Sequence, residues 1–180
     1  MIIDIGTGDG RAVLARARAE PASLVIGVDA AAASMAETSR RADRRGPHNA
    51  AFFAAGAEAL ASSPFAGTAD QVTVTFPWGS LLRGLVGLEE LALQGVAATL
   101  TRGGRLEVLA SVVPADRIDS LDCLDDGSAS AIASAWSAAG LRLTAMRPAT
   151  RLEIKAANSS WARRLGPGRP VWRLEGALAG

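Results

Sequence analysis

The chain has almost no histidine or cysteine, and it has no tyrosine. Its 180 residues include one histidine, His48, and one cysteine, Cys123. A disulfide framework and a metal site built on cysteine pairs are therefore excluded. A catalytic triad or a zinc site would have to use His48, and nothing in its surroundings, RGPHN, is arranged for either. We expect no metal.

Long apolar runs and an excess of charge of one sign are also absent. No stretch of about 18 apolar residues occurs, and the opening MIIDIGTGDG lacks the basic region of a signal peptide. We therefore expect a cytoplasmic protein with no membrane partner. Lys and Arg number 19 and Asp and Glu 18, for a formal net charge of +1. Any contact with nucleic acid must then come from local patches, not from a global basic field.

What the sequence does contain is an alternation of short apolar runs with helical patterns. The expected strands span residues 2–5, 23–29, 50–56, 69–76, 103–113, 141–148 and 170–180. The expected helices span residues 11–20, 31–45, 81–100 with a break near 84–87, and 128–140. Such alternation predicts βαβ units and a mostly parallel sheet. We expect one α/β domain over residues 1–180, with helices on both faces of the sheet and a linker over about 149–169.

The segment DIGTGDG, residues 4–10, lies at the first strand-to-helix turn. Gly6, Gly8 and Gly10 let the backbone turn tightly and approach a ligand, and the following helix directs its free N–H groups at that ligand. Asp29 ends the next strand, where a carboxylate can bind ribose hydroxyls. A glycine loop with an acidic residue about 20 residues further on is the arrangement of nucleotide-binding sites. The alternative is a tight turn without a ligand.

The acidic residues of this loop indicate which nucleotide the loop binds. Asp9 stands inside the loop and Asp4 at the strand end, where carboxylates disfavour a pyrophosphate but suit an ammonium group. S-adenosylmethionine is therefore favoured over NAD. After the third strand, backbone near Ala57 and Glu58 could meet the adenine ring, although Glu58 could also simply begin a helix. The expected cofactor contacts are Asp4, Gly6, Thr7, Gly8, Asp9, Gly10, Asp29, Ala57 and Glu58.

The fourth strand runs into FPWGS, residues 76–80. In an open α/β sheet this strand neighbours the first, so the segment faces the reactive methyl group. Enzymes that methylate the exocyclic amine of adenine often carry Asn/Asp-Pro-Pro-aromatic here, whereas this chain has Phe76, Pro77 and Trp78. An aromatic face without a side-chain acceptor suits a planar substrate whose nucleophile is a ring nitrogen with its own lone pair.

Three motifs together resemble one family. DIGTGDG, FPWGSLLRG and SSWARRLG look like those of the 16S rRNA (adenine-1408-N1) methyltransferases, which give resistance to aminoglycosides such as kanamycin and apramycin. The resemblance runs from the first strand to the last. Many methyltransferases share the glycine motif, but FPWGSLL followed by SW-x-RRL is much more specific. The resemblance implies a class I Rossmann-like fold and transfer of methyl from S-adenosylmethionine to N1 of adenine 1408 in 16S rRNA. It also implies S-adenosylhomocysteine as product and aminoglycoside resistance as outcome.

The resemblance also implies roles for two of the four tryptophans. In that family two tryptophans hold the flipped-out adenine, and the matching residues here are Trp78 and Trp161. By the same resemblance Ser159 or Ser160 lines the target pocket, with Ser160 as our catalytic candidate; the alternative is that both cap a short helix. The alternative for each tryptophan is local packing, which Trp136 and Trp172 fit well.

Two groups of arginines match regions that face the RNA backbone in that family, and the resemblance implies that the linker over about 149–169, which carries one of the groups, contacts the RNA. Arg163, Arg164 and Arg169 surround Trp161, and the second helix carries a further group at Arg40, Arg41, Arg44 and Arg45. Arginines there would grip phosphates and make binding salt-dependent. The alternative for the second group is a solvated helix face. We expect the small ribosomal subunit as partner and a monomeric protein.

The chain departs from the family in three places. The family carries a segment before the first strand, often a hairpin that touches the ribosome, whereas this sequence begins at the strand. The linker after the second helix reads DRRGPHN in place of Lys and paired Gly, and PADRIDSLDCLDDG is short and acidic. Two alternatives stay open: a methyltransferase of the same fold for small aromatic molecules, and a weakly active member that binds cofactor or ribosome without efficient methylation.

Overall fold

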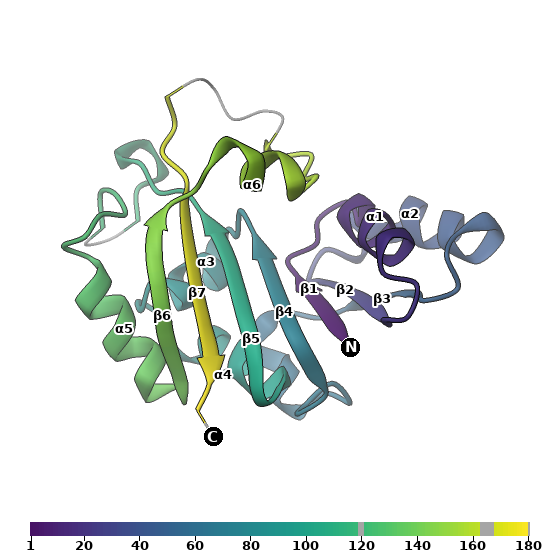
Figure 1. Ribbon diagram of the computed structural model, residues 1–180, viewed down its shortest axis with the longest axis horizontal. Helices are drawn as coiled ribbons and strands as arrows, with labels where there is room; N and C mark the ends of the chain where they lie inside the picture. The colour runs from purple at the N-terminus through teal and green to yellow at the C-terminus, as the bar shows by residue number, and fades with distance from the viewer. Residues whose placement is uncertain (119–120, 163–167, 180) are drawn as a thin grey trace.

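A twisted seven-stranded sheet forms the centre of the protein (Figure 1). The computed structural model describes residues 1–118, 121–162 and 168–179. The strands are β1 (Ile2–Ile5), β2 (Val25–Asp29), β3 (Ala50–Ala54), β4 (Ala69–Thr75), β5 (Leu100–Ala110), β6 (Leu141–Pro148) and β7 (Trp172–Leu178). Their order is β3-β2-β1-β4-β5-β7-β6. All neighbouring pairs are parallel except those of β7, which runs antiparallel to both β5 and β6.

Helices cover the two faces unequally (Figure 1). The α-helices are α1 (Arg11–Ala19), α2 (Ala32–Arg45), α3 (Gly79–Leu85), α4 (Glu90–Thr99), α5 (Ala129–Ala138) and α6 (Arg151–Ala156), and the 3-10 helices are η1 (Ala57–Ser62) and η2 (Pro114–Asp116). Helices α1 and α2 lie on one face, over β1, β2 and β3, and α3, α4 and α5 lie on the other. Helix α6 lies beyond the carboxyl ends of β4 and β5, at the top of the sheet in Figure 1.

The observed elements confirm the expected α/β fold with a mostly parallel seven-stranded sheet. The expected helix over 81–100 is two helices, α3 and α4, separated by a turn at Gly87, close to the expected break. The expected strand at 103–113 begins at Leu100 instead, because Leu100 pairs with Ala69 of β4. The linker after β6 is not irregular throughout, since α6 occupies its first part.

The main core lies between the sheet and α3, α4 and α5. Apolar strand side chains such as Ile3, Val72 and Leu106 are fully buried there. Trp136 of α5 is also fully buried, and its indole N–H donates to the carbonyl of Leu85 at 2.9 Å. This contact confirms the core role expected for Trp136, and it satisfies the polar atom that burial would otherwise leave unpaired. Trp172 is half-buried and packs against the same core.

Helix α4 packs so closely against η1 at Gly95 that no side chain would fit at this position. A Cβ at Gly95 would stand 1.9 Å from the carbonyl oxygen of Ala57. Helix propensity alone predicts that Gly95→Ala stabilises the protein by about 1 kcal/mol. We expect the opposite sign, a net loss of about 1–3 kcal/mol, because the added methyl group forces the backbones apart. Equilibrium denaturation with urea measures the change, and a Gly95→Ala protein more stable than the wild type would contradict it.

Neither a membrane span nor a metal cluster occurs among the described residues. No helix there has the length and apolar character that crossing a membrane requires. Nor do these residues contain a group of three or more His, Cys, Asp and Glu side chains placed to hold a metal ion.

Candidate active site

The loop between β1 and α1 turns with three glycines in the left-handed region. Gly6, Gly8 and Gly10 have φ angles of 74°, 59° and 71°. Space restricts the last of them as well, because a Cβ at Gly10 would stand 2.5 Å from the ring of Phe52. Residues with a side chain rarely adopt such angles. The loop therefore needs glycine at alternate positions, as expected from the sequence.

Asp29 holds this loop in place from the end of β2. One carboxylate oxygen accepts the N–H of Gly8 at 2.8 Å, and the other accepts the N–H of Ala31 at 2.8 Å. Each oxygen keeps a second lone pair. Asp29 can thus shape the glycine loop and still accept hydroxyl groups from a ligand.

Asp4, at the end of β1, is the most enclosed carboxylate of the site. It is 8% exposed, and it accepts a hydrogen bond from the hydroxyl of Thr73 at 2.8 Å. Burial raises the pKa of Asp4, while the hydroxyls of Thr7 and Thr73 and the charge of Arg16 act in the opposite direction. The Thr7 hydroxyl lies near enough to affect that pKa, but its geometry satisfies no hydrogen bond. A cationic ligand group beside Asp4 would therefore lower the pKa of this carboxyl toward its ordinary value and keep it charged.

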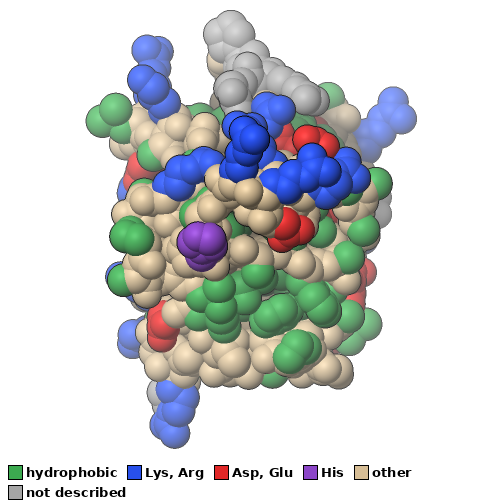
Figure 2. All heavy atoms as spheres, turned by 90° about the vertical axis from the view of Figure 1, so that its right-hand side faces the viewer, with side chains coloured by type: hydrophobic (Ala, Val, Ile, Leu, Met, Phe, Trp, Pro, Cys, Tyr) green, Lys and Arg blue, Asp and Glu red, His purple; other side chains and the backbone are tan. Residues whose placement is uncertain are grey.

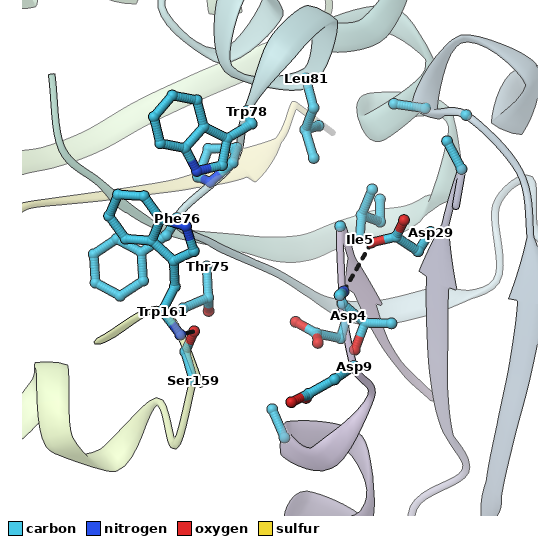
Figure 3. A pocket seen from close by; sticks show the side chains of 18 of the residues that line it. Asp4, Ile5, Asp9, Asp29, Thr75, Phe76, Trp78, Leu81, Ser159 and Trp161 are labelled. Atoms are coloured by element: carbon cyan, nitrogen blue, oxygen red, sulfur yellow. Dashed lines mark hydrogen bonds between the residues drawn. The ribbon is translucent and has the colours of Figure 1, made fainter. Parts of the chain in front are cut away.

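These residues line one half of a cavity of about 370 Å³ (Figure 3). Asp4, Asp9 and Asp29 lie on one side of it, and the cavity wall includes Ala57 and Glu58 of η1. Every residue of the expected cofactor set except Gly10 lines this cavity, and Gly10 begins the helix behind it. A hydrogen bond with Ser80 lowers the pKa of Glu58, so this carboxylate stays charged and joins η1 to the start of α3.

Aromatic side chains form the opposite wall (Figure 3). The ring centroids of Trp78 and Trp161 are 5.1 Å apart, with planes inclined by 53°. Phe76 stacks on Trp161 with centroids 5.9 Å apart and planes inclined by 25°. Phe76 has a φ of 52°, a left-handed conformation that costs a bulky residue energy. The backbone thus turns directly after β4, where the side chains of Phe76 and Trp78 meet Trp161, which lies 83 positions beyond Trp78 in the sequence.

In this structure the two indole rings touch each other. A planar base between two stacked rings requires a separation of about 7 Å, or two van der Waals spacings. The observed 5.1 Å leaves no such space. A planar group could lie between the rings only if they moved apart by about 2 Å, and Trp78, which is 48% exposed, has room to do so.

Comparison with known proteins places this chain in one family. The family model described as 16S rRNA (adenine(1408)-N(1))-methyltransferase matches residues 1–176. A protein of that name from Streptoalloteichus hindustanus is 31% identical over 182 residues, covering 94% of this chain and 81% of its own. One from Escherichia coli is 27% identical, over 93% of this chain and 81% of its own.

Solved structures agree with the sequence comparison. The 16S rRNA methyltransferase KamB superposes with a TM-score of 0.88 at 30% identity, over 99% of this chain and 87% of its own. A tryptophan-to-alanine mutant of the enzyme from Catenulisporales acidiphilia, solved with its cosubstrate SAM, gives a TM-score of 0.87 at 32% identity. That match covers 99% of this chain and 85% of the other. The chain belongs to the 16S rRNA (adenine(1408)-N(1))-methyltransferase family.

The resemblance to the 16S rRNA (adenine-1408-N1) methyltransferases implies that one of the two serines before Trp161 lines the target pocket. Ser159 and Ser160 both line the cavity beside Trp161. The hydroxyl of Ser159 accepts the backbone N–H of Trp161, two positions further on, at 3.1 Å. The short helix that the serines were expected to cap would continue into residues 163–167, which lie outside the described residues. Ser160 thus remains our candidate for the target pocket.

Arg169 has internal partners that the sequence did not indicate. Its guanidinium forms an ion pair with Asp116, and its Nε donates to the hydroxyl of Ser111 at 2.9 Å. It also lies over the indole of Trp161, 5.3 Å from the ring centroid. The side chain is 20% exposed, so it braces Trp161 in this structure. Its contact with RNA stays a prediction.

The other expected RNA-binding arginines are divided between two regions. Arg163 and Arg164 lie outside the described residues. Arg44 and Arg45 lie in the last turn of α2 and are exposed. Figure 2 shows the side of the molecule formed by α2 and β3, where Lys and Arg side chains gather in a band across the upper part of the face. Contact of these arginines with RNA stays a prediction.

Sequence reasoning missed several residues of the site. Leu81 closes the cavity next to the glycine loop, and a Cβ at Gly6 would stand 2.8 Å from its methyl group. Ser80 was missed as the partner of Glu58. A polar residue two positions after Trp78, at the start of a helix, was the available signal. The stacking of Phe76 on Trp161 had no local signal, because it joins distant segments.

Proposed function

We propose that this protein transfers the methyl group of S-adenosylmethionine to N1 of adenine 1408 in 16S rRNA of the small ribosomal subunit. The reaction leaves S-adenosylhomocysteine and confers resistance to aminoglycosides. The observation that carries the proposal is the meeting of an acidic nucleotide site and a tryptophan pair in one cavity. Family membership over residues 1–176 supports it. The site of action would be the cytoplasm, where ribosomes are found.

The cofactor end of the cavity fits S-adenosylmethionine on the chemistry of its side chains. The ligand would bring a methyl group activated on a positively charged sulfur, together with an ammonium group. Asp4 or Asp9 holds the ammonium end, directly or through water, and Asp29 holds the ribose. Backbone at Ala57 and Glu58 borders the adenine. Carboxylates at these positions favour a cationic ligand and disfavour a pyrophosphate.

The aromatic end would position the target base. Trp78 and Trp161 stack on the flipped-out adenine, and about 1–3 kcal/mol of stacking per base offsets the cost of flipping. As the bond between N1 and methyl forms, the bond between methyl and sulfur breaks. Positive charge therefore moves from sulfur to the adenine ring. The faces of the two indoles attract that charge more strongly as it develops, so they stabilise the transition state more than the bound substrate.

No general base is needed in this mechanism. N1 of adenine attacks with its own lone pair, so no proton has to leave before transfer. Catalysis then rests on positioning the two reactants in line, for which effective molarities are large. This agrees with the absence of an Asn or Asp side chain in the segment Phe76 to Ser80.

Transfer of tritiated methyl groups to purified 30S subunits tests the proposal. We expect label in 16S rRNA and a reverse-transcription stop at adenine 1408. Cofactor binding by calorimetry without label in 30S would contradict it and favour the weakly active member. If a small aromatic molecule were the substrate, reversing the charges of Arg163 and Arg164 would leave turnover unchanged. A loss of 30S methylation in that variant supports the ribosomal substrate.

A further inference from the structure

A row of polar side chains crosses the sheet on the face where α1 lies, outside the cavity of the proposed active site. Strand register places Thr73 of β4 beside Glu107 of β5, and Leu109 of β5 beside Arg173 of β7. Alternate residues of a strand point to the same face, so Gln71, Glu107 and Arg173 share one face of the sheet. Hydrogen bonds join these three side chains into a line across three strands.

The line begins at α1 and ends at α6. Arg16 of α1 donates to the side-chain oxygen of Gln71 at 3.0 Å, and the amide nitrogen of Gln71 donates to Glu107 at 2.8 Å. The other oxygen of Glu107 accepts a hydrogen bond from Arg173 at 2.9 Å, and the same guanidinium lies 3.5 Å from the carboxylate of Glu153 in α6. Each end of the line therefore lies beside one half of the proposed active site.

At the α1 end the line reaches the cofactor half. Burial raises the pKa of Asp4, and the charge of Arg16 acts against that rise. Arg16 and Asp4 also line a common cavity of about 420 Å³. Helix α1 begins directly after Gly10 of the glycine loop. A displacement of α1 on the sheet would therefore move the loop that borders the cofactor.

At the α6 end the line holds the helix that precedes Trp161. The carboxylate of Glu153 also accepts two hydrogen bonds from Arg147, at 2.6 and 3.0 Å. Ile154, the next residue of the helix, packs in the apolar cluster that includes Phe76 and Trp161. The place of α6 on the sheet therefore determines where the indole of Trp161 lies.

We propose that Arg173 is a positioning residue for methyl transfer, which fixes α6, and through it Trp161, relative to the cofactor half. The proposal rests on the proposed function, since Trp161 is taken to hold the target base. The side chain of Arg173 is 20% exposed, and it contacts three carboxylates, those of Glu107, Glu153 and Glu175. Partly exposed ion pairs add little to stability. Transfer between two bound reactants, in contrast, can slow about 100-fold when they are misplaced by about 1 Å.

Arg173→Gln tests this proposal, because it removes the branched cationic contact and keeps a polar side chain. We expect the single-turnover rate at saturating 30S to fall about tenfold, with half-saturating 30S and affinity for S-adenosylmethionine within about twofold of wild type. The α6 amides of Ile154 and Ala157, which donate within the helix, should exchange hydrogen about tenfold faster once the anchor is lost. Arg173→Lys, which keeps the charge, should recover part of both losses.

Arg142→Gln is the matched control. Arg142 is exposed, and its pairing with Ala177 places it on the same face as Arg173, roughly 13 Å away at 3.3 Å per strand residue. The control removes the same charge and should keep the wild-type rate and exchange. Wild-type transfer by Arg173→Gln, or a loss of cofactor affinity as large as the loss of rate, would overturn the proposal. Wild-type protein that adds no methyl group to 30S would contradict the proposed function, and unchanged α6 exchange in Arg173→Gln would overturn the anchoring role even then.

Discussion

Trp78→Ala should reduce methyl transfer to 30S subunits about 100-fold, the effect of losing up to about 3 kcal/mol of base stacking. Affinity for S-adenosylmethionine should stay within about twofold of wild type, because the acidic half of the cavity is unchanged. Trp78 is 48% exposed, so its removal leaves the core intact. Single-turnover transfer and calorimetry of cofactor binding measure the two effects separately.

Trp78→Phe serves as the control for this experiment. A phenyl ring keeps part of the stacking surface and a weaker attraction for developing positive charge, so an intermediate rate is expected. Rates should then rank with the aromatic face and not with side-chain volume, which Trp78→Leu can check. Wild-type transfer by Trp78→Ala would refute the stacking role. An equal loss of cofactor affinity would instead assign Trp78 to the cofactor site.

Asp4→Asn should weaken S-adenosylmethionine binding by about 2–3 kcal/mol, or about thirtyfold to 150-fold, because it leaves a bound ammonium group without a buried carboxylate. Wild-type affinity should also fall as pH decreases through the raised pKa of Asp4, since protonation removes its charge. The Asn variant should lack this dependence. Calorimetric titrations over a range of pH values test both statements.

The folding stability of the ligand-free protein should depend on pH in the opposite direction to its affinity for S-adenosylmethionine. Because burial raises the pKa of Asp4, the folded protein holds this proton more tightly than the unfolded chain. The stabilising contribution is complete below the unfolded pKa and is lost as pH rises through the folded pKa. Asp4→Asn removes the buried charge, so the free protein at neutral pH should melt no lower than wild type.

Asp9→Asn distinguishes the two candidates for the methionine end. The Asp9 carboxylate is 35% exposed and lies 3.6 Å from the guanidinium of Arg11. Solvent screens its charge, so its loss should weaken binding less than about fivefold. A larger effect for Asp9→Asn than for Asp4→Asn would reverse the assignment.

The sheet could be predicted from sequence because its strands carry local signals. IIDI and VIGVD are short apolar runs that end in turn residues, and both became buried parallel strands. Local signals also identified the glycine loop with Asp29. They were present for α6 as well, since Thr150 and Glu153 have capping-box spacing. The linker interpretation passed over this short helix because Leu152 and Ile154 make too short an apolar pattern.

The remainder of the site depends on contacts between segments distant in sequence. Arg169 lies in a basic stretch, where charge suggests RNA binding, but Asp116, 53 positions earlier, is its ion-pair partner. The resemblance paired Trp78 with Trp161, yet it could not show that their rings touch. Nor could it show that Phe76 supports Trp161 from behind. Such features arise from the packing of the segment that follows β4 against the segment that follows α6.

The antiparallel placement of β7 has a consequence for how such enzymes can be diversified. Pro148 at the end of β6 pairs with Trp172 at the start of β7. The chain between these two residues therefore leaves the sheet and returns to it at the same pair of strand ends. The chain from 149 to 171 is thus an excursion whose length and composition can change without shifting the register of any strand. Exchanging this segment between related enzymes offers a direct route to altered substrate choice, with the methyl-donor half of the molecule left as it is.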